Sequence, residues 1–481
     1  MSAEWKRVKV DDIKSQDKYS CVGGPFGSSL SRKHYVEDIG VPVIRGVNLS
    51  NDIFWDDDFV FVSEEKGQEL YRNLAFPGDL VFTQRGTLGQ VALIPEHSKF
   101  PNYVVSQSQM KLTVNKDVAH PYYVYLYFRS KDAKEHIERN AIVGGVPHIN
   151  LGILKALELP LPPLSEQHEI VRIVSSIDDK ITLNTQTNQT LEQMAQALFK
   201  SWFVDFDPVI DNALDSGFFE REFAGEDIPE PLAKRVAIRQ ALRETAGGTD
   251  TAAPVIGGLP SETRALFPDS FEEHPELGWI PKGWGAGCLA DIASYTSNRI
   301  ATAELSLSNY VSTENMLVEK KGIVDAANLP TVNTVPAYTT GNVLISNIRP
   351  YFKKIWMANG DGGHSNDVLG FVAKHPSTEG YLFNLLYQDA LFDFMMTTSK
   401  GSKMPRGDKK AIMGWPVVIP PSNLRVYFSE RVGDFYVSNN SKVEENKTLA
   451  NLRDTLLPKL LSGELTVFDV CQENQVESKV A

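Results

Sequence analysis

Cysteine is scarce in this chain, and its scarcity excludes two kinds of structure. The 481 residues include three cysteines, Cys21, Cys288 and Cys471, which lie far apart in the sequence. A structural zinc site needs ligands at short spacing, and a disulfide framework needs a denser set of cysteines. We therefore expect no metal site and no disulfide scaffold, and interpret the three thiols as buried or tolerated residues.

Long apolar runs are also missing. No stretch approaches the ~18 uninterrupted apolar residues that a membrane helix requires. The first residues, MSAEWKRVKVDD, lack the apolar core of a signal peptide. We therefore expect a cytoplasmic protein. Its composition, 42% hydrophobic and 23% charged, is that of a globular protein, and the length predicts about three folding units.

Excess positive charge is absent too, and this argues at first against nucleic-acid binding. The formal net charge is −13, whereas phosphate contact needs a basic surface. However, residues 205–276 hold 16 Asp and Glu against 6 Lys and Arg, so −10 of the −13 lies in this segment and −3 remains elsewhere. Proline and glycine pairs also gather there, and we interpret 208–275 as an acidic linker, ordered in parts, with a short helix around 232–245.

The most informative feature that is present is an internal repeat. Pro147 precedes the proline pair 162–163 as Pro405 precedes the pair 420–421, and both matches are 258 residues apart. The offset persists to Leu198 and its counterpart Leu456, so about fifty residues align without a gap. Upstream the offset drifts to 263 and then 279, as loops of different length would cause. The sequence predicts two copies of one globular domain, each followed by a better-matched helix.

The globular parts contain signals for both strands and helices. Short β-type runs bounded by turn residues alternate with helical stretches, which predicts an α+β fold. The β-type runs are 41–44, 79–83, 343–348 and 415–419, and the helical stretches are 121–140 and 381–396. The expected organisation is 1–162 first domain, 163–207 central long helix, 208–275 acidic linker, 276–419 second domain, 420–465 distal long helix and 466–481 C-terminal tail.

The segment after each proline pair has a 4-3-4-3 apolar spacing, with Ser165 as the expected N-cap of the first helix. Both seams are apolar at the ends and polar in the middle, so two such helices packed on each other would align their polar centres. The matched centres favour a coiled-coil spacer; alternatively, each helix is core for its own domain. The seam positions are Ile170, Val174, Ile177, Ile181, Asn184, Asn188, Leu191, Ala195 and Leu198 in the first helix, and Phe428, Val432, Phe435, Asn439, Lys442, Asn446, Leu449, Arg453 and Leu456 in the second.

Several short motifs, taken in their order, resemble the specificity subunit of type I restriction–modification enzymes over nearly the whole chain. They are GPFGS at 24–28, VPVIRG at 41–46, PGDLV at 77–81, LPPLSEQ at 161–167, SWFVDF at 201–206, YVSTENM at 310–316, SNIRPY at 346–351 and LLSGEL at 460–465. The second copy departs from the family pattern with Ser422-Asn423-Leu424 after its proline pair, which leaves the capping of the second helix open.

The resemblance implies a function without catalysis. It implies two target-recognition domains that each read one half of a split site in double-stranded DNA, separated by the two helices. It also implies docking of two adenine-N6 methyltransferase subunits and of restriction (motor-nuclease) subunits. S-adenosylmethionine, ATP and magnesium would belong to those partners, with no cofactor in this chain. The alternative is a non-catalytic DNA-binding or scaffold protein of another defence or regulatory system.

Motifs for catalysis are missing from the sequence, in agreement with that expectation. The proline pairs lack the Asn or Asp that an adenine methyltransferase loop requires, and no GxxxxGK[ST] phosphate loop occurs. Asp361 and Asp367 near His364 are the nearest approach to a nuclease cluster, and we interpret them as a polar loop. We therefore expect no catalytic residue.

Candidate DNA contacts are basic side chains for phosphates and Arg, Lys, Asn or Gln for base edges. In the first domain they are Ser28, Arg32, Lys33, Tyr35, Gln84, Arg85, Gln107, Gln109 and His148. In the second they are Arg349, Tyr351, Lys353, Lys354, Lys400, Lys403, Arg406, Lys409 and Lys410. The segment 400–410 has five basic residues against one acid and is either a phosphate-binding loop or a solvated turn. For single residues such as Gln107 or His148, a purely structural role is the alternative.

Overall fold

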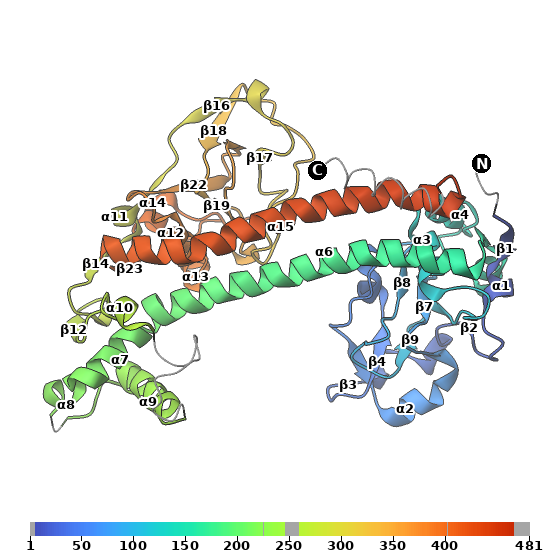
Figure 1. Cartoon of the computed structure of the whole chain (residues 1–481), viewed down its shortest axis with the longest axis horizontal. Coiled ribbons are helices and arrows are strands. Elements are labelled where there is room, and N and C mark those ends of the chain that lie inside the picture. Colours follow the sequence, from blue (N-terminus) through green and yellow to red (C-terminus); the bar gives the residue numbers. More distant parts are fainter. Residues whose placement is uncertain (1–4, 225, 246–258, 402, 466–481) are drawn as a thin grey trace, which may run out of the picture. The chain divides into compact units, whose positions relative to one another are not determined.

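Two compact units divide the chain, and each contains its own β-rich domain (Figure 1). The computed structural model describes residues 5–224, 226–245, 259–401 and 403–465. The first unit runs to Leu183 and includes the chain again from Glu445, and the second unit is Asn184–Glu444. Antiparallel sheets and helices occur together in both units, so the expected α+β class is confirmed. None of the described helices is long and apolar enough to cross a membrane.

A four-stranded antiparallel sheet forms the centre of each domain, with the same strand order in both. In the first it is β2 (Cys21–Gly23), β10 (Gln109–Leu112), β7 (Leu80–Thr83) and β8 (Val91–Leu93). In the second it is β15 (Ala293–Tyr295), β22 (Val368–Ala373), β19 (Val343–Ser346) and β20 (Ile355–Met357). The two matching strands β7 and β19 are buried at every residue. This burial explains why both read as short continuous apolar runs.

The turn into each of these strands is also duplicated. Gly78 (φ 89°) and Gly341 (φ 86°) hold left-handed conformations that glycine adopts at least cost. The next side chain accepts a hydrogen bond from the backbone three residues earlier: Asp79 from Phe76 N at 2.9 Å, and Asn342 from Thr339 N at 3.0 Å. The sequence pairs Gly-Asp and Gly-Asn therefore do the same structural work.

Further sheets complete each domain. The first domain adds a five-stranded sheet in the order β3 (Tyr35–Val36), β5 (Val60–Val62), β4 (Val41–Ile44), β9 (Tyr103–Val105) and β6 (Leu74–Ala75), and the pair β1 (Arg7–Lys9) with β11 (Glu158–Pro160). The second adds β16 (Arg299–Ala301), β18 (Thr334–Tyr338), β21 (Gly362–His364) and β17 (Tyr310–Val311), and the pairs β12 (Phe271–His274) with β13 (Gly278–Pro281) and β14 (Gly285–Cys288) with β23 (Pro416–Ile419).

The helices extend the repeat further upstream than Pro147. Four helix pairs begin 258 residues apart, for example at 121 and 379. They are α3 (Pro121–Arg129) with α12 (Glu379–Leu386), α4 (Lys131–Arg139) with α13 (Asp389–Thr397), α5 (Leu151–Ala156) with α14 (Lys409–Met413), and α6 (Leu164–Phe199) with α15 (Ser422–Ser462). The constant offset thus covers a whole helical half of each domain.

Three details differ from the expectation. The stretch 381–396 is two helices, α12 and α13, because the backbone at Gln388 is extended. The stretch 121–140 is two helices, because Ser130 breaks it and caps α4 by accepting a hydrogen bond from Ala133 N at 3.2 Å. The assignment of Ser165 as N-cap was wrong: α6 begins at Leu164, and the Pro163 carbonyl accepts from Glu166 N at 2.9 Å. The helix α15 begins in the same way, with the Pro421 carbonyl accepting from Leu424 N at 3.1 Å. The second proline of each pair therefore takes the capping position.

The long helices α6 and α15 pack on each other in antiparallel fashion within each unit, so the packing favoured by the sequence is confirmed. In the first unit Lys180 lies 3.3 Å from Glu445, and in the second Asn188 Nδ2 donates to Asn439 O at 3.3 Å. The alternative also holds in part, since Ile170 and Val174 belong to the core of the first domain. The helix ends are domain core, and the middles pack helix on helix.

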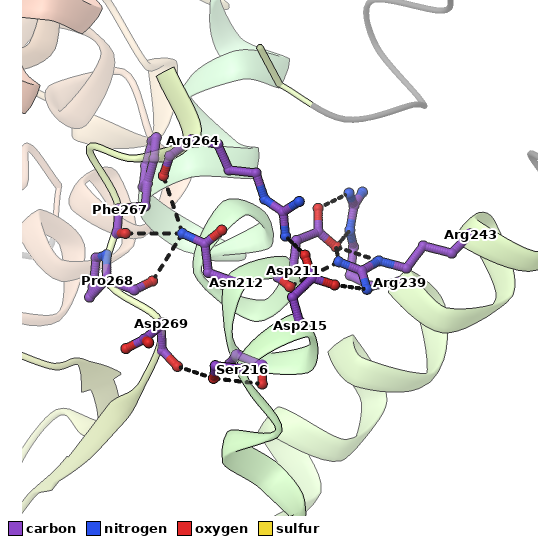
Figure 2. A network of polar contacts seen from close by, with 11 residues as sticks. Asp211, Asn212, Asp215, Ser216, Arg239, Arg243, Arg264, Phe267, Pro268 and Asp269 are labelled. Atoms are coloured by element: carbon purple, nitrogen blue, oxygen red, sulfur yellow. Dashed lines mark hydrogen bonds and ion pairs between the residues drawn. The ribbon is translucent and has the colours of Figure 1, made fainter. Parts of the chain in front are cut away.

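In the acidic segment after α6, aspartates of one helix pair with arginines of the next (Figure 2). The helix expected around 232–245 is confirmed as α9 (Glu230–Thr245), which packs on α7 (Asp207–Ser216). Asp211 pairs with Arg239 and with Arg243, the latter at 3.2 Å, and Asp215 pairs with Arg243 at 2.9 Å. Arginines four residues apart on α9 thus face aspartates four residues apart on α7.

Candidate nucleic-acid interface

Several candidate residues of the first domain gather at one end of its four-stranded sheet. Thr83 of β7 pairs with Gln109 of β10, and the residue that follows, Gln84, donates its backbone N–H to Ser108 O at 2.7 Å. The chain leaving β2 joins them, because Gly24 N donates to Gln109 O at 2.9 Å. A β-bridge between Arg85 and His148 adds a further loop. Segments far apart in the sequence therefore meet at this sheet end.

The side chains at this end divide into anchored and free groups. Gln109 is 1% exposed and accepts a hydrogen bond from Ser106 Oγ, and Gln107 Nε2 donates to the carbonyls of Gly27 and, at 3.2 Å, Leu30. Both glutamines thus hold their own loops. Ser28 and Arg85 are exposed and Gln84 is half-buried. In the described part of the chain these last three form no side-chain hydrogen bond or ion pair.

The other three candidates of the first domain lie elsewhere. Arg32 and Lys33 are exposed on a 3-10 turn, Arg32–His34, and Tyr35 begins β3 at the edge of the five-stranded sheet. Neither cation has an ion-pair partner among the described residues. Tyr35 packs on the small core beneath that sheet.

In the second domain the equivalent sheet end brings two candidate segments side by side. Asn347 N donates to Asp367 O at 2.8 Å, and Arg349 N donates to Pro405 O at 2.8 Å. A β-bridge between Ile348 and Arg406 joins the same segments. The β19–β20 turn (residues 347–354) therefore lies against the basic loop (residues 400–410).

Two of the five cations of the basic loop have acidic partners. Lys400 lies 2.7 Å from Asp408, and its hydrogen bond holds the pKa of Asp408 below the ordinary value. Arg406 lies 3.2 Å from Asp367. Lys403, Lys409 and Lys410 are exposed, and none of the three has an ion pair within the described ranges. Three lysines therefore remain available to an anion.

The cations of the β19–β20 turn are used differently. Lys353 lies 3.0 Å from Asp389 of α13, and Lys354 Nζ donates to Thr313 O at 2.7 Å. Burial lowers the pKa of Lys354. Tyr351 is 47% exposed, and Arg349 has no side-chain hydrogen bond or ion pair to another described residue. The two lysines fasten the turn, whereas the Arg349 side chain has no polar partner among the described residues and the Tyr351 ring packs on the neighbouring Phe352.

Residues that the sequence did not single out also lie at the first sheet end. Arg45 follows β4 next to Ser106, whose N–H donates to Ile44 O at 3.0 Å, and the Arg45 Nε is buried without a hydrogen-bond partner. Phe26 is 93% exposed and Val143 85% exposed. An aromatic residue between glycines, in the motif at 24–28, was the signal that could have identified Phe26.

The expected helix seams lie at the buried faces of α6 and α15. Every seam position in both helices is buried or half-buried, including the polar Asn184, which is 1% exposed. Asn446 Nδ2 donates to Ile181 O at 3.5 Å in the first unit. Amide side chains of the polar centre therefore reach across to the partner helix, Asn446 in the first unit and Asn188 in the second.

A cavity of about 580 Å³ lies in the first unit between α3 and the two long helices. Asp178 in its wall already accepts from Tyr122 OH at 2.8 Å and pairs with Arg129 at 3.4 Å and Arg453 at 2.9 Å. No group of three or more potential metal ligands occurs among the residues described. Cys21 is buried and Cys288 half-buried, both as free thiols, and Cys471 lies outside the described residues.

Comparison with known proteins shows that the chain is similar to DNA specificity subunits. Residues 23–193 match the family model of the type I restriction modification DNA specificity domain. The chain is 29% identical over 406 residues to the HindI specificity subunit of Haemophilus influenzae, covering 76% of this chain and 82% of that one. It is 24% identical to the MjaIX specificity subunit of Methanocaldococcus jannaschii, covering 97% and 95%. A crystal structure of the type I S subunit from M. genitalium shares the fold, with a TM-score of 0.51, 14% identity, and coverage of 95% and 96%.

Proposed function

This chain belongs to the family of DNA specificity subunits of type I restriction–modification systems, and from that premise we propose that its two β-rich domains each read one half of a bipartite site in double-stranded DNA. The observation that carries the proposal is the duplicated sheet with polar and basic side chains at the same end. Two similar surfaces on one chain suit two half-sites.

Within each surface, different side chains serve different purposes in the proposal. Exposed cations without acidic partners, such as Arg85, Lys403, Lys409 and Lys410, contact phosphates. The anchored groups, such as Gln107 and Lys353, fix the loops that carry them. Arg32, Lys33, Ser28, Gln84, His148 and Tyr351 remain candidates for direct contact.

The chain acts as part of a complex with methyltransferase and restriction subunits and is itself non-catalytic. We further propose that the packed helices α6 and α15 dock two methyltransferase subunits, one for each half-site. S-adenosylmethionine, ATP and magnesium then belong to those partners, and the cytoplasm is the expected compartment. The long, continuous helices support this proposal, since they offer an extended surface outside the reading domains.

Methylome sequencing of the host, with and without this gene, tests the proposed function. We expect one bipartite motif whose adenine methylation disappears when the gene is deleted and returns when it is supplied again. The purified chain alone should transfer no labelled methyl group to DNA. The proposal would be contradicted if every methylated motif persisted after the deletion, or if the isolated chain transferred methyl groups.

A further inference from the structure

The turns that follow the two equivalent central strands share a backbone feature but not a residue type. Each contains two left-handed positions. In the first domain both are glycine, Gly86 (φ 109°) and Gly89 (φ 81°), whereas in the second they are Arg349 (φ 51°) and Lys353 (φ 49°). Glycine adopts these angles freely, while side chains with a Cβ do so at a cost. A long cationic residue persists at such a position only where other interactions or a function compensate for the cost of the backbone conformation.

For Lys353 the compensating interactions lie within the domain. Its ammonium group pairs with Asp389 at 3.0 Å, and the next residue, Lys354, donates to Thr313 O at 2.7 Å. These two bonds fasten the far side of the β19–β20 turn to α13 and to a neighbouring loop. The turn is thus attached to the rest of the domain through both lysines.

For Arg349 no internal reason is found. Its Nε is buried without a hydrogen-bond partner, and no carboxylate among the described residues pairs with its guanidinium. Two further unpaired polar atoms lie at the same sheet end: Oδ1 of Asn347, a residue 7% exposed, and Oγ of Ser365. Buried polar atoms without partners are uncommon, because each loses its hydrogen bonds to water and gains none within the protein. Three together indicate a surface completed by a polar ligand.

We propose that Arg349 reads a guanine in the major groove of the second half-site. Guanine presents two adjacent acceptors, O6 and N7, which match the paired N–H donors of a guanidinium. A phosphate contact alone would not require a strained, half-buried position, and Lys403, Lys409 and Lys410 already supply exposed charge nearby. The backbone hydrogen bond from Arg349 N to Pro405 O, at 2.8 Å, holds Arg349 beside the basic loop that carries these lysines. The inference rests on the proposed function, namely that this domain binds DNA.

The test uses the full chain assembled with its methyltransferase subunits. Binding is measured for the methylome-derived target and for duplexes in which each base pair is replaced in turn. The variant Arg349→Gly suits the left-handed position, so its melting temperature should equal or exceed that of the parent. Its affinity for the target should fall about 5- to 150-fold, with preference lost at one G·C pair of the second half-site. Arg349→Lys should also lose that preference.

Lys403→Ala is the matched control. It should weaken binding to all duplexes alike and lower the log–log salt slope by about 0.9. If Arg349→Gly behaves as this control does, or leaves binding unchanged, Arg349 is not a base reader. A second half-site without a G·C pair would also overturn the inference. Failure of the proposed function looks different, because the parent complex would then prefer no bipartite sequence at all.

Discussion

The β7–β8 turn (residues 84–90) and the β19–β20 turn connect equivalent strands, yet each meets its neighbouring helix in a different way. At Gly89 the chain passes so close to α4 that an added Cβ would lie 3.2 Å from Lys134 Cγ. In the second domain Lys353 instead reaches α13 through an ion pair with Asp389 at 3.0 Å. The first domain thus has a glycine, Gly89, where its turn contacts the helix, and the second domain has a charged residue, Lys353. Duplication has preserved strand order, while the turns have diverged.

The loops that follow show the same divergence. The loop 142–148 and the segment 400–406 have equal length, and each closes with a β-bridge between its end residues. Each is followed by a helix cap, Asn150 or Asp408, at the same offset. The first loop exposes Val143 and Val146, whereas the second exposes Lys403 and Met404. The two loops therefore expose different surfaces, apolar in the first domain and partly cationic in the second.

Exchange of a whole domain is the largest test of this comparison. Replacing residues 276–419 with the matching domain of a relative should change one half of the methylated motif and leave the other half unaltered. The reason is that each domain has its own central sheet and its own turns at the sheet end. Methylome mapping of the chimera gives the answer. If both halves of the motif change together, the copies do not read independently.

The basic loop should differ from its apolar counterpart in salt dependence. Replacing Lys403, Lys409 and Lys410 with Ala should flatten the log–log slope of affinity against salt by up to about three units, at ~0.9 per phosphate. Adding Arg406→Ala should contribute less, because Arg406 is partly neutralised by Asp367 at 3.2 Å. Titration of binding at several salt concentrations measures this.

The matched variant in the first domain is Val143→Ala with Val146→Ala. It removes exposed apolar surface and no charge, so its salt slope should equal that of the parent. Equal slopes for the basic-loop and apolar-loop variants would show that the two loops do not differ in phosphate contact.

The fold was largely readable from the sequence because the repeat constrained it. The offset of 258 residues is a property of the helices, and four pairs of helices start at that spacing. The partners of individual cations were not readable. Lys353 and Lys400 are indistinguishable from Lys403 in the sequence, and only folding brings Asp389 and Asp408 beside the first two. Left-handed backbone at Arg349 was equally hidden, since sequence patterns predict glycine at such positions.

The helix pair allows a test of what separates the two copies. We propose that its length sets the gap between half-sites. Four residues inserted near Thr185, which is exposed in the middle of α6, lengthen one helix by roughly 6 Å and turn it by about one turn. The unread spacer should grow by one or two base pairs, at about 3.4 Å per pair, while both half-sites stay fixed. An active complex with an unchanged spacer would contradict this role.

The junctions between the domains and the long helices should differ in stability. In the first unit Asp178 pairs with Arg129 at 3.4 Å and Arg453 at 2.9 Å. In the second Gln196 donates to Asn384 Oδ1 at 2.7 Å. Asp178→Asn leaves the largely buried Arg129 without an ion-pair partner and removes one of the two partners of Arg453, which keeps Asp454 at 2.8 Å. It should cost about 1–3 kcal/mol, whereas Gln196→Ala should cost about 1 kcal/mol. Hydrogen exchange of α3 and α12 amides measures each junction separately. The reverse order of costs would contradict this account.

The smallest expected effect concerns Asp389, which fastens the β19–β20 turn. Hydrogen bonds from Lys320 and then Lys353 hold the pKa of Asp389 below its ordinary value. A lowered carboxylate pKa stabilises the fold above the ordinary pKa, and this contribution is lost as the pH falls through the lowered value. Since the side chain is 58% exposed, Asp389→Asn should cost less than about 1 kcal/mol. The difference in melting temperature from the parent should be present at neutral pH and should be lost as the pH falls through the lowered pKa of Asp389. The matched variant is Lys131→Gln, at the equivalent position of α4, where Lys131 pairs loosely with Glu135 at 3.9 Å. It should change neither stability nor reading, whereas Asp389→Asn should relax discrimination in the second half-site by less than about fivefold. Equal effects of the two variants would mean that the ion pair does not hold the turn.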